Sequence, residues 1–139
     1  MKKPLLCLFL CFTYFGFSQT ECLLGVGGTN DDTIAEVFQL SEEQKESLRN
    51  WSAELKVRNN ILKDKANYML KKHKESSPEV LMTFSREYKN ILDSMRQNAR
   101  MIDKRMLSIL NEKQYEFYLK LCGQLTLTPI YVDGSVNEK

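Results

Sequence analysis

The chain has 139 residues and a mass of 16.2 kDa, which is the size of one domain. Hydrophobic residues make up 42% and charged residues 27% of the chain, which excludes both a disordered protein and a membrane protein with several spans. Six Gly and three Pro exclude a collagen-like or low-complexity chain. A single His and the lack of a nucleotide-loop signature argue against most metalloenzymes and nucleotidases.

Residues 1–18 have the pattern of a secretory signal peptide. Lys2 and Lys3 precede an apolar run over residues 4–17, and Ser18 is a small residue suited to a cleavage site. The run is shorter than the roughly 20 residues that a transmembrane helix needs. We therefore expect a periplasmic or secreted protein, cleaved near Ser18; an N-terminal anchor that is retained is the alternative.

Cleavage removes two of the four cysteines and leaves Cys22 and Cys122. A pair of cysteines in an exported chain favours one disulfide, because that compartment is oxidising. The bond closes a loop of 100 residues, for which the chain-entropy estimate is up to about 4.7 kcal/mol. Two free or intermolecular thiols are the alternative.

Residues 19–29 are expected to form a flexible N-terminal segment, because they hold a glycine cluster. This cluster lacks the Lys-Ser/Thr pair and the preceding strand of a phosphate-binding loop. A helical domain is expected over residues 30–123. It begins with a short helix, with Asn30 and the two following aspartates as N-cap candidates and with an apolar face of Ile34, Val37 and Phe38.

Two long helices follow. Ser41 and Gln44 form a capping box, which opens a helix from Glu42 to about Lys74, roughly 50 Å long. Its apolar stripe predicts that Trp51 and Leu55 face a second helix; the full stripe is Leu48, Trp51, Leu55, Leu62, Ala66 and Met69.

The second helix has Ser77 as its N-cap and Pro78 in its first turn, and it runs to about Leu110. Because the two helices match in length and share a short turn, they predict a long antiparallel hairpin. Its stripe is Leu81, Phe84, Tyr88, Ile91, Met95, Ile102, Met106 and Ile109. The fold class is therefore all-α, with short helices at the base of the hairpin.

A third capped helix starts after Asn111, with Gln114 in the capping-box position, and Gly123 is expected to close it. The tail, residues 124–139, alternates in polarity and predicts either a short edge strand or a strap over the helices. From Asp133 onward we expect disorder.

No catalytic constellation is visible in the sequence. His73 lies among lysines and has no neighbouring Cys or Asp for acid–base or nucleophilic work. A zinc site would need His73 together with Cys22 and Cys122, at the opposite end of the hairpin. We expect neither an enzyme nor a metal site, and no cofactor.

The charges are polarised along the chain. Residues 56–105, the basic arm, hold 13 basic and six acidic residues, a net charge of +7, whereas residues 19–55 hold two and eight, a net of −6. Nucleic acid is not an expected partner for an exported protein. Anionic proteins, an anionic lipid surface and a second subunit stay open, as does a merely solvated surface.

The candidate residues for binding a protein client lie on this arm. The basic ones are Lys56, Arg58, Lys63, Lys65, Arg86, Lys89, Arg96 and Arg100, and the apolar ones are Met82, Phe84, Met95 and Met101. Methionine is common on adaptable binding surfaces. The alternative is that the apolar residues form the core of the hairpin.

The two capped helix starts carry a family resemblance. Leu40-Ser41-Glu42-Glu43-Gln44 and Leu110-Asn111-Glu112-Lys113-Gln114 resemble the paired Leu-Thr-x-x-Gln motifs of the Spy/CpxP family of exported, all-helical stress proteins. Ser41 and Asn111 replace Thr but keep its capping role. The resemblance covers residues 34–122 and implies a hairpin, a homodimer forming a curved cradle, and ATP-independent binding of unfolded proteins on a basic, partly apolar concave face.

Three features depart from that family pattern. The chain without its signal peptide has a net charge of zero, the Cys22 and Cys122 pair lies outside the motifs, and the chain has no His-rich tract. We expect an ATP-independent chaperone or envelope-stress protein whose partners are unfolded or specific proteins. A non-enzymatic adaptor with one specific envelope partner is the alternative. A homodimer is expected, and a membrane surface is the less favoured partner.

Overall fold

The computed structural model describes residues 20–132. The expected signal peptide, the expected cleavage site near Ser18 and the disorder expected from Asp133 lie outside these residues. In chain order the elements are β1 (Glu21–Cys22), α2 (Asp31–Val37), α3 (Glu42–Lys72), α4 (Pro78–Ser108), α5 (Glu112–Gln124) and β2 (Thr128–Pro129). Helices dominate, and the two strands of the described part have two residues each, so the all-α class is confirmed.

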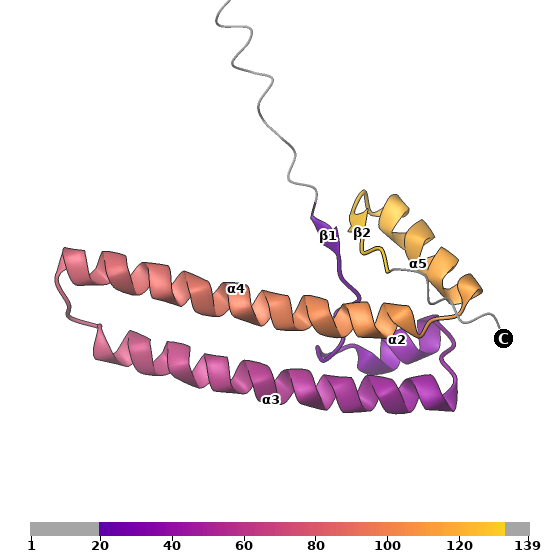
Figure 1. Ribbon diagram of the computed structural model, residues 1–139, viewed down its shortest axis with the longest axis horizontal. Coiled ribbons are helices and arrows are strands. Elements are labelled where there is room, and N and C mark those ends of the chain that lie inside the picture. Colours follow the sequence, from indigo (N-terminus) through magenta and orange to yellow (C-terminus); the bar gives the residue numbers. More distant parts are fainter. Residues whose placement is uncertain (1–19, 133–139) are drawn as a thin grey trace, which may run out of the picture.

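Helices α3 and α4 have 31 residues each, run in opposite directions and lie side by side (Figure 1). Each helix stops two residues before the end expected from the sequence, because His73 and Ile109 take the C-cap positions. Pro78 occupies the first turn of α4, where its missing N–H costs no hydrogen bond. The remaining elements gather at one end of this pair, which we call the base.

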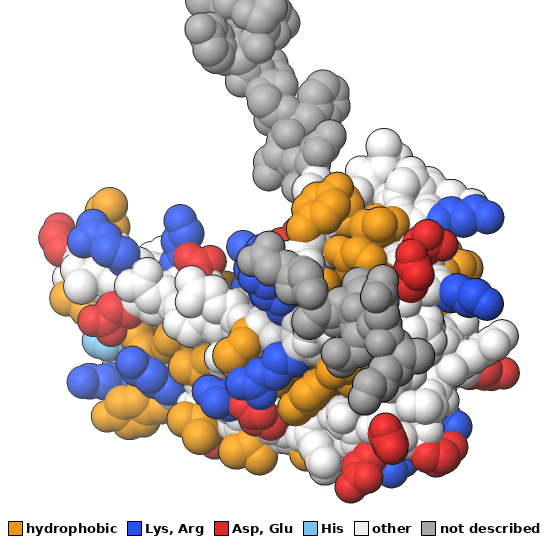
Figure 2. All heavy atoms as spheres, turned by 45° about the vertical axis from the view of Figure 1, so that its right-hand side comes forward, with side chains coloured by type: hydrophobic (Ala, Val, Ile, Leu, Met, Phe, Trp, Pro, Cys, Tyr) orange, Lys and Arg blue, Asp and Glu red, His pale blue; other side chains and the backbone are white. Residues whose placement is uncertain are grey.

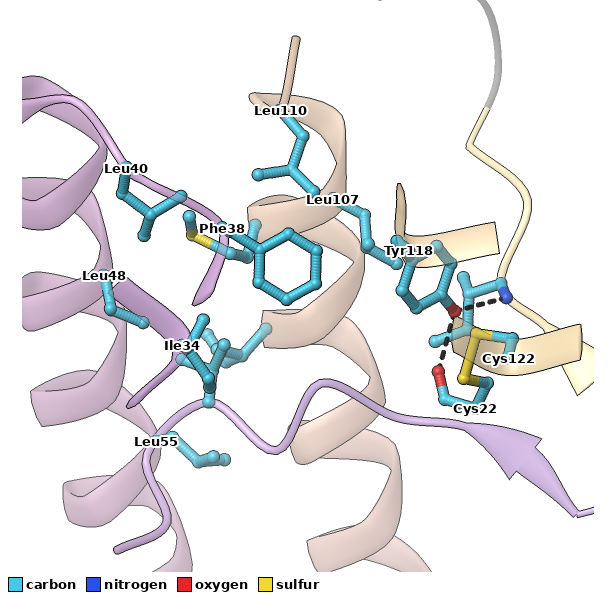
Figure 3. Packing of buried hydrophobic residues seen from close by; sticks show 14 residues of the cluster. Cys22, Ile34, Phe38, Leu40, Leu48, Leu55, Leu107, Leu110, Tyr118 and Cys122 are labelled. Atoms are coloured by element: carbon cyan, nitrogen blue, oxygen red, sulfur yellow. Dashed lines mark hydrogen bonds between the residues drawn. A yellow bond between two sulfur atoms is a disulfide. The ribbon is translucent and has the colours of Figure 1, made fainter. Parts of the chain in front are cut away.

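Most buried apolar residues lie in one cluster at the base (Figure 3). It combines residues of every helix, among them Ile34 from α2, Leu48 from α3, Leu107 from α4 and Tyr118 from α5. Leu55 is buried in this cluster and Trp51 lies partly buried against it. Trp51 and Leu55 therefore face inward, as the stripe predicts.

The far half of the hairpin has only a thin apolar seam. Its buried residues are Ala66, Met69 and Ile91, and its partly buried ones are Leu62, Phe84, Tyr88 and Met95. Two helices alone have little interior. The base therefore supplies most of the hydrophobic stabilisation, and the far half presents most of its surface to solvent.

The segment over residues 20–29 is ordered by long-range contacts, which corrects the expectation of a flexible N-terminal segment. β1 pairs in parallel with β2, with Glu21 opposite Thr128. Val26 is buried in the base cluster. Gly27 has φ +81°, and a Cβ there would come 2.9 Å from Cδ2 of Leu55, so glycine lets this loop lie against α3.

Two helix caps also differ from the sequence expectation. Gly123 lies inside α5, which continues to Gln124, and Thr126 takes the left-handed conformation with φ 56° instead. The side chain of Asn30 makes no capping bond to α2. Asp31 accepts a hydrogen bond from the Gly27 N–H at 2.8 Å, so it supports the glycine loop from the first turn of α2.

The disulfide between Cys22 and Cys122 is present, with Cα atoms 5.7 Å apart and a sequence separation of 100 residues. It joins β1 to α5, and both cysteines are buried in the base cluster. The bond therefore holds the start of the described chain against its last helix.

Replacing both cysteines, Cys22→Ala with Cys122→Ala, is expected to lower the free energy of unfolding by up to about 4.7 kcal/mol, because the unfolded chain gains the entropy of an open 100-residue loop. Urea unfolding of the disulfide-bonded protein measures this change. Wild-type protein unfolded with a reductant serves as the control and should match the variant. An unchanged unfolding midpoint contradicts the prediction.

Candidate functional site

The two motifs that carry the family resemblance form capping boxes at the starts of α3 and α5. Ser41 Oγ accepts from the Gln44 N–H at 3.2 Å, and Gln44 Oε1 accepts from the Ser41 N–H at 2.9 Å. Asn111 and Gln114 repeat the arrangement at 3.0 and 2.9 Å. Both boxes satisfy amides that a helix start leaves without a partner.

The two boxes are bonded to each other through their glutamines. Gln44 Nε2 donates to Gln114 Oε1 at 2.9 Å and to the Ile109 carbonyl at 2.8 Å. Gln114 Nε2 donates to the Phe38 carbonyl at 3.0 Å, and Gln114 is 8% exposed. Leu40 and Leu110, which precede the boxes, are buried in the base cluster. We call this arrangement the glutamine joint; it ties α3, α4, α5 and the end of α2 together, and its role is structural.

Gln114→Ala is expected to lower the free energy of unfolding by about 1–3 kcal/mol, because the Phe38 carbonyl and Gln44 lose a buried partner. Gln124→Ala in the same helix is the control, because Gln124 is exposed. Urea unfolding of both variants gives the comparison. Equal midpoints for the two variants contradict the structural role of the joint.

A buried carboxylate holds the N-terminal loop on α4. Asp103 is 1% exposed and accepts from the Gly25 and Val26 N–H groups, each at 3.0 Å. Burial raises the pKa of Asp103, and the charge of Glu21 adds to this rise, while the backbone hydrogen bonds oppose it. Within residues 20–132 no ion pair includes Asp103. With backbone amides as its contacts, the carboxylate positions a loop and has no partner for acid–base chemistry.

The hydroxyl of Tyr118 connects β1 to the segment that follows β2. It donates to the Cys22 carbonyl at 2.7 Å and accepts from the Ile130 N–H at 2.8 Å (Figure 3). Burial is the main cause that raises the pKa of Tyr118. Sequence reasoning did not single out Asp103 or Tyr118. A signal for Asp103 was present, because it lies directly after Ile102 on the buried side of an apolar stripe.

The pH dependence of stability is expected to report on Asp103. Because the folded pKa of Asp103 is raised above its ordinary 3.8, stability from the neutral carboxyl is present below that value and is lost as pH rises through the folded pKa. Asp103→Asn cannot titrate. The unfolding free energy of the wild type minus that of the variant should therefore decrease as pH rises through this range. Urea unfolding at several pH values measures it. A difference that grows with pH contradicts the raised pKa.

The candidate client-binding cations fall into separate groups. Arg86, Lys89, Arg96 and Arg100 are exposed and lie three, seven and four residues apart on α4, which places them on one face. We call them the basic stripe. Arg100 Nε donates to Glu21 at 2.7 Å, and Asp93 lies within the stripe, 3.8 Å from Arg96. In Figure 2 basic side chains lie among apolar ones over the arm.

The α3 candidates do not join this stripe. Lys56 and Lys63 are seven residues apart on one flank of α3, and Arg58 and Lys65 are seven residues apart on another. All four are exposed, and Arg58 is paired with Glu54 at 2.8 Å. The eight cations therefore do not form a single patch.

Three of the four apolar candidates are partly buried, which agrees with the alternative that they belong to the core of the hairpin. Phe84 and Met95 are partly buried in the seam of the hairpin, and Met101 packs against the base cluster. Met82 alone among the four is largely exposed, at 73%. The large exposed apolar residues of the arm that were not among the candidates are Val57, Ile61, Tyr68, Leu70, Val80, Leu81 and Leu92.

Open grooves lie along the helices of residues 20–132. One groove of about 570 Å³ lies between α2 and α3, and Asp32, Glu36 and Arg49 are among its lining residues. Another of about 540 Å³ follows α4 beside Lys104. In the described part of the chain, no three His, Cys, Asp or Glu side chains gather as metal ligands, and no helix has the length and apolar character to cross a membrane.

Comparison with known proteins found no matching family model, no matching curated protein and no matching solved structure. The Spy/CpxP resemblance therefore rests on the two capped motifs alone.

Proposed function

We propose that this chain is an exported, non-enzymatic chaperone that binds unfolded proteins on the outer face of α4 without nucleotide. The observation that supports it best is the basic stripe, four exposed cations on one face of a 31-residue helix. The stripe leads toward the hairpin tip, where apolar side chains are exposed; these are Leu70, Val80, Leu81 and Met82.

The cations of the basic stripe and the exposed apolar groups at the tip would act one after the other. The cations raise the encounter rate with acidic unfolded chains, an attraction that salt screens over about 8–10 Å. Exposed apolar groups at the tip then hold hydrophobic segments of the client. Because Met82 is flexible and polarisable, it fits side chains of different shapes, so the site requires no one client sequence.

The signal-peptide pattern and the paired motifs support the same assignment. An exported protein works where ATP is scarce, and the chain has no nucleotide-loop signature. The motifs at Ser41 and Asn111 resemble those of exported stress proteins that bind unfolded chains. The structure adds a stable base that leaves the arm's outer faces free.

Reversing the charge of the stripe is expected to slow client capture about tenfold or more, because electrostatic steering is lost. The variant carries Arg86→Glu, Lys89→Glu and Arg96→Glu; Arg100 is kept because it is bonded to Glu21. The readout is the suppression of client aggregation at stoichiometric amounts, without ATP, at low and high salt. Helicity should stay unchanged, since all three side chains are exposed.

The matched control reverses three exposed cations away from the stripe, Arg49→Glu, Lys113→Glu and Lys120→Glu. It makes the same change in net charge and should protect clients as well as the parent at physiological salt. Equal protection by stripe variant and control overturns the charge mechanism. If the parent protects no client, the chaperone function itself is wrong.

A specific adaptor is the second candidate, favoured by the groove between α2 and α3. The groove is lined by the acidic Asp32 and Glu36, the basic Lys45 and Arg49, and the apolar Leu40 and Leu48. This lining suits a partly apolar segment of one partner that carries charges of both signs. Asp32→Lys with Glu36→Lys should abolish binding of such a partner and leave aggregation suppression unchanged. Loss of aggregation suppression in this variant argues against a separate adaptor site.

A further inference from the structure

The outer side of α3 exposes large apolar side chains in the half of the helix that leads to the hairpin tip. Val57, Ile61 and Tyr68 are exposed by 62%, 67% and 64%, so no described element covers them. Steps of four and seven residues keep these three on one helical face. The buried residues Leu55 and Ala66 lie on the opposite side of the helix, toward the base cluster and α4. Aligned apolar groups on a free face mark an interaction surface.

Cations flank this apolar line on both sides. Lys56 and Lys63 lie on one flank, Arg58 and Lys65 lie on the other, and all four are exposed. Residues 56–72 hold six basic residues in all and a single acid, Asp64. Within residues 20–132 no ion pair includes any of the five lysines of this stretch, which are Lys56, Lys63, Lys65, Lys71 and Lys72.

The combination of an apolar line with basic flanks is typical of helices that lie in the plane of a membrane surface. The stems of Lys and Arg cover apolar surface while their charged ends reach the headgroups. Tyrosine suits the same level, because its ring is apolar and its hydroxyl is polar. In Figure 1 α3 forms the lower edge of the molecule, and Figure 2 shows apolar and basic side chains beside one another along that edge.

We propose that a lipid bilayer with anionic headgroups docks on the outer side of α3, over residues 56–72. Val57, Ile61 and Tyr68 would enter the boundary between headgroups and acyl chains, and the flanking cations would contact the headgroup phosphates. Stable attachment at a surface takes both apolar burial and attraction between opposite charges. This half of α3 offers both.

The other half of α3 determines how the hairpin would lie on the bilayer. Its first turns carry Glu42, Glu43 and Glu46, and residues 19–55 together have a net charge of −6. An anionic surface repels this end. Glu43 lies about 21 Å from Val57 along the helix, beyond the screening length of about 8 Å. The hairpin would therefore tilt with its tip on the bilayer and its base raised.

This inference goes beyond the proposed function and does not rest on it. The basic stripe lies on the side of α4 that is opposite its buried residues, such as Ile91 and Ile102. The stripe therefore points away from α3. A hairpin that rests on its outer α3 side would leave Arg86, Lys89 and Arg96 accessible to a client.

Co-sedimentation with vesicles tests the docking in the disulfide-bonded protein. The probes are vesicles of phosphatidylcholine with about one third phosphatidylglycerol, and vesicles of phosphatidylcholine alone. The parent is expected to bind the anionic vesicles more tightly, with an advantage that falls as salt rises. The apolar run over residues 4–17 is the same in every variant, so differences among variants report on α3.

Two variants remove the two parts of the attraction separately. Ile61→Asn removes apolar contact area at constant charge and is expected to weaken binding to anionic vesicles about tenfold. Lys65→Gln with Lys72→Gln is expected to weaken it about fivefold for each cation lost. All three side chains are exposed, so helicity should stay unchanged.

Matched controls make the same changes elsewhere on the surface. Leu92→Asn on α4 replaces another exposed apolar residue, and Lys113→Gln with Lys120→Gln on α5 removes two exposed cations at the base. Both controls should bind vesicles like the parent.

Asp64→Asn gives a test in the opposite direction. Asp64 is the one acid among residues 56–72, so its removal is expected to strengthen binding to anionic vesicles about fivefold and to leave binding to neutral vesicles unchanged. A face with a merely structural role would gain nothing from this change.

A parent that binds anionic vesicles no better than neutral ones overturns the proposal, as does an Ile61→Asn variant that binds like the parent. Sedimentation equilibrium on the same samples identifies a different occupant: loss of self-association in Ile61→Asn with unchanged vesicle binding shows that this side docks a protein. Aggregation suppression without vesicles separates the two functions. A chain that binds vesicles and protects no client overturns the chaperone alone, and the reverse result overturns the lipid contact alone.

Discussion

The burial of one apolar cluster at the base is the constraint on which the other elements depend. Ile34, Leu48, Leu107 and Tyr118 come from four different helices and reach the same interior. Loop closure costs entropy, and here the disulfide, the glutamine joint and the Asp103 contacts all close their loops at this end. With the base held in this way, α3 and α4 extend beyond it on a seam of few side chains.

The helices could be predicted from local patterns in the sequence, whereas contacts between distant segments leave no such pattern. Ser41 and Gln44 are three residues apart, so their capping box is legible in the sequence. The hydrogen bond from Gln44 to Gln114 joins residues 70 positions apart, and no rule of sequence spacing predicts it. The loop at Gly25 looked flexible for the same reason, because its anchor, Asp103, lies 78 residues away.

The candidate binding residues show a second limit of sequence periodicity. A stripe indicates which side of a helix is apolar, but not how much of it a neighbour covers. Phe84 and Met95 lie on the covered side of α4, and Met82, on the opposite side, stays exposed. The exposed pattern around Val57 is invisible until the buried side of α3 is known, because Leu55 and Ile61 are equally hydrophobic in the sequence.

The two outer faces of the hairpin differ in a way that suits different partners. The stripe on α4 has four cations and one carboxylate, so two copies of it repel each other and attract an anionic chain. The outer side of α3 instead exposes the large side chains Val57, Ile61 and Tyr68, so it offers hydrophobic contact area where α4 offers charge.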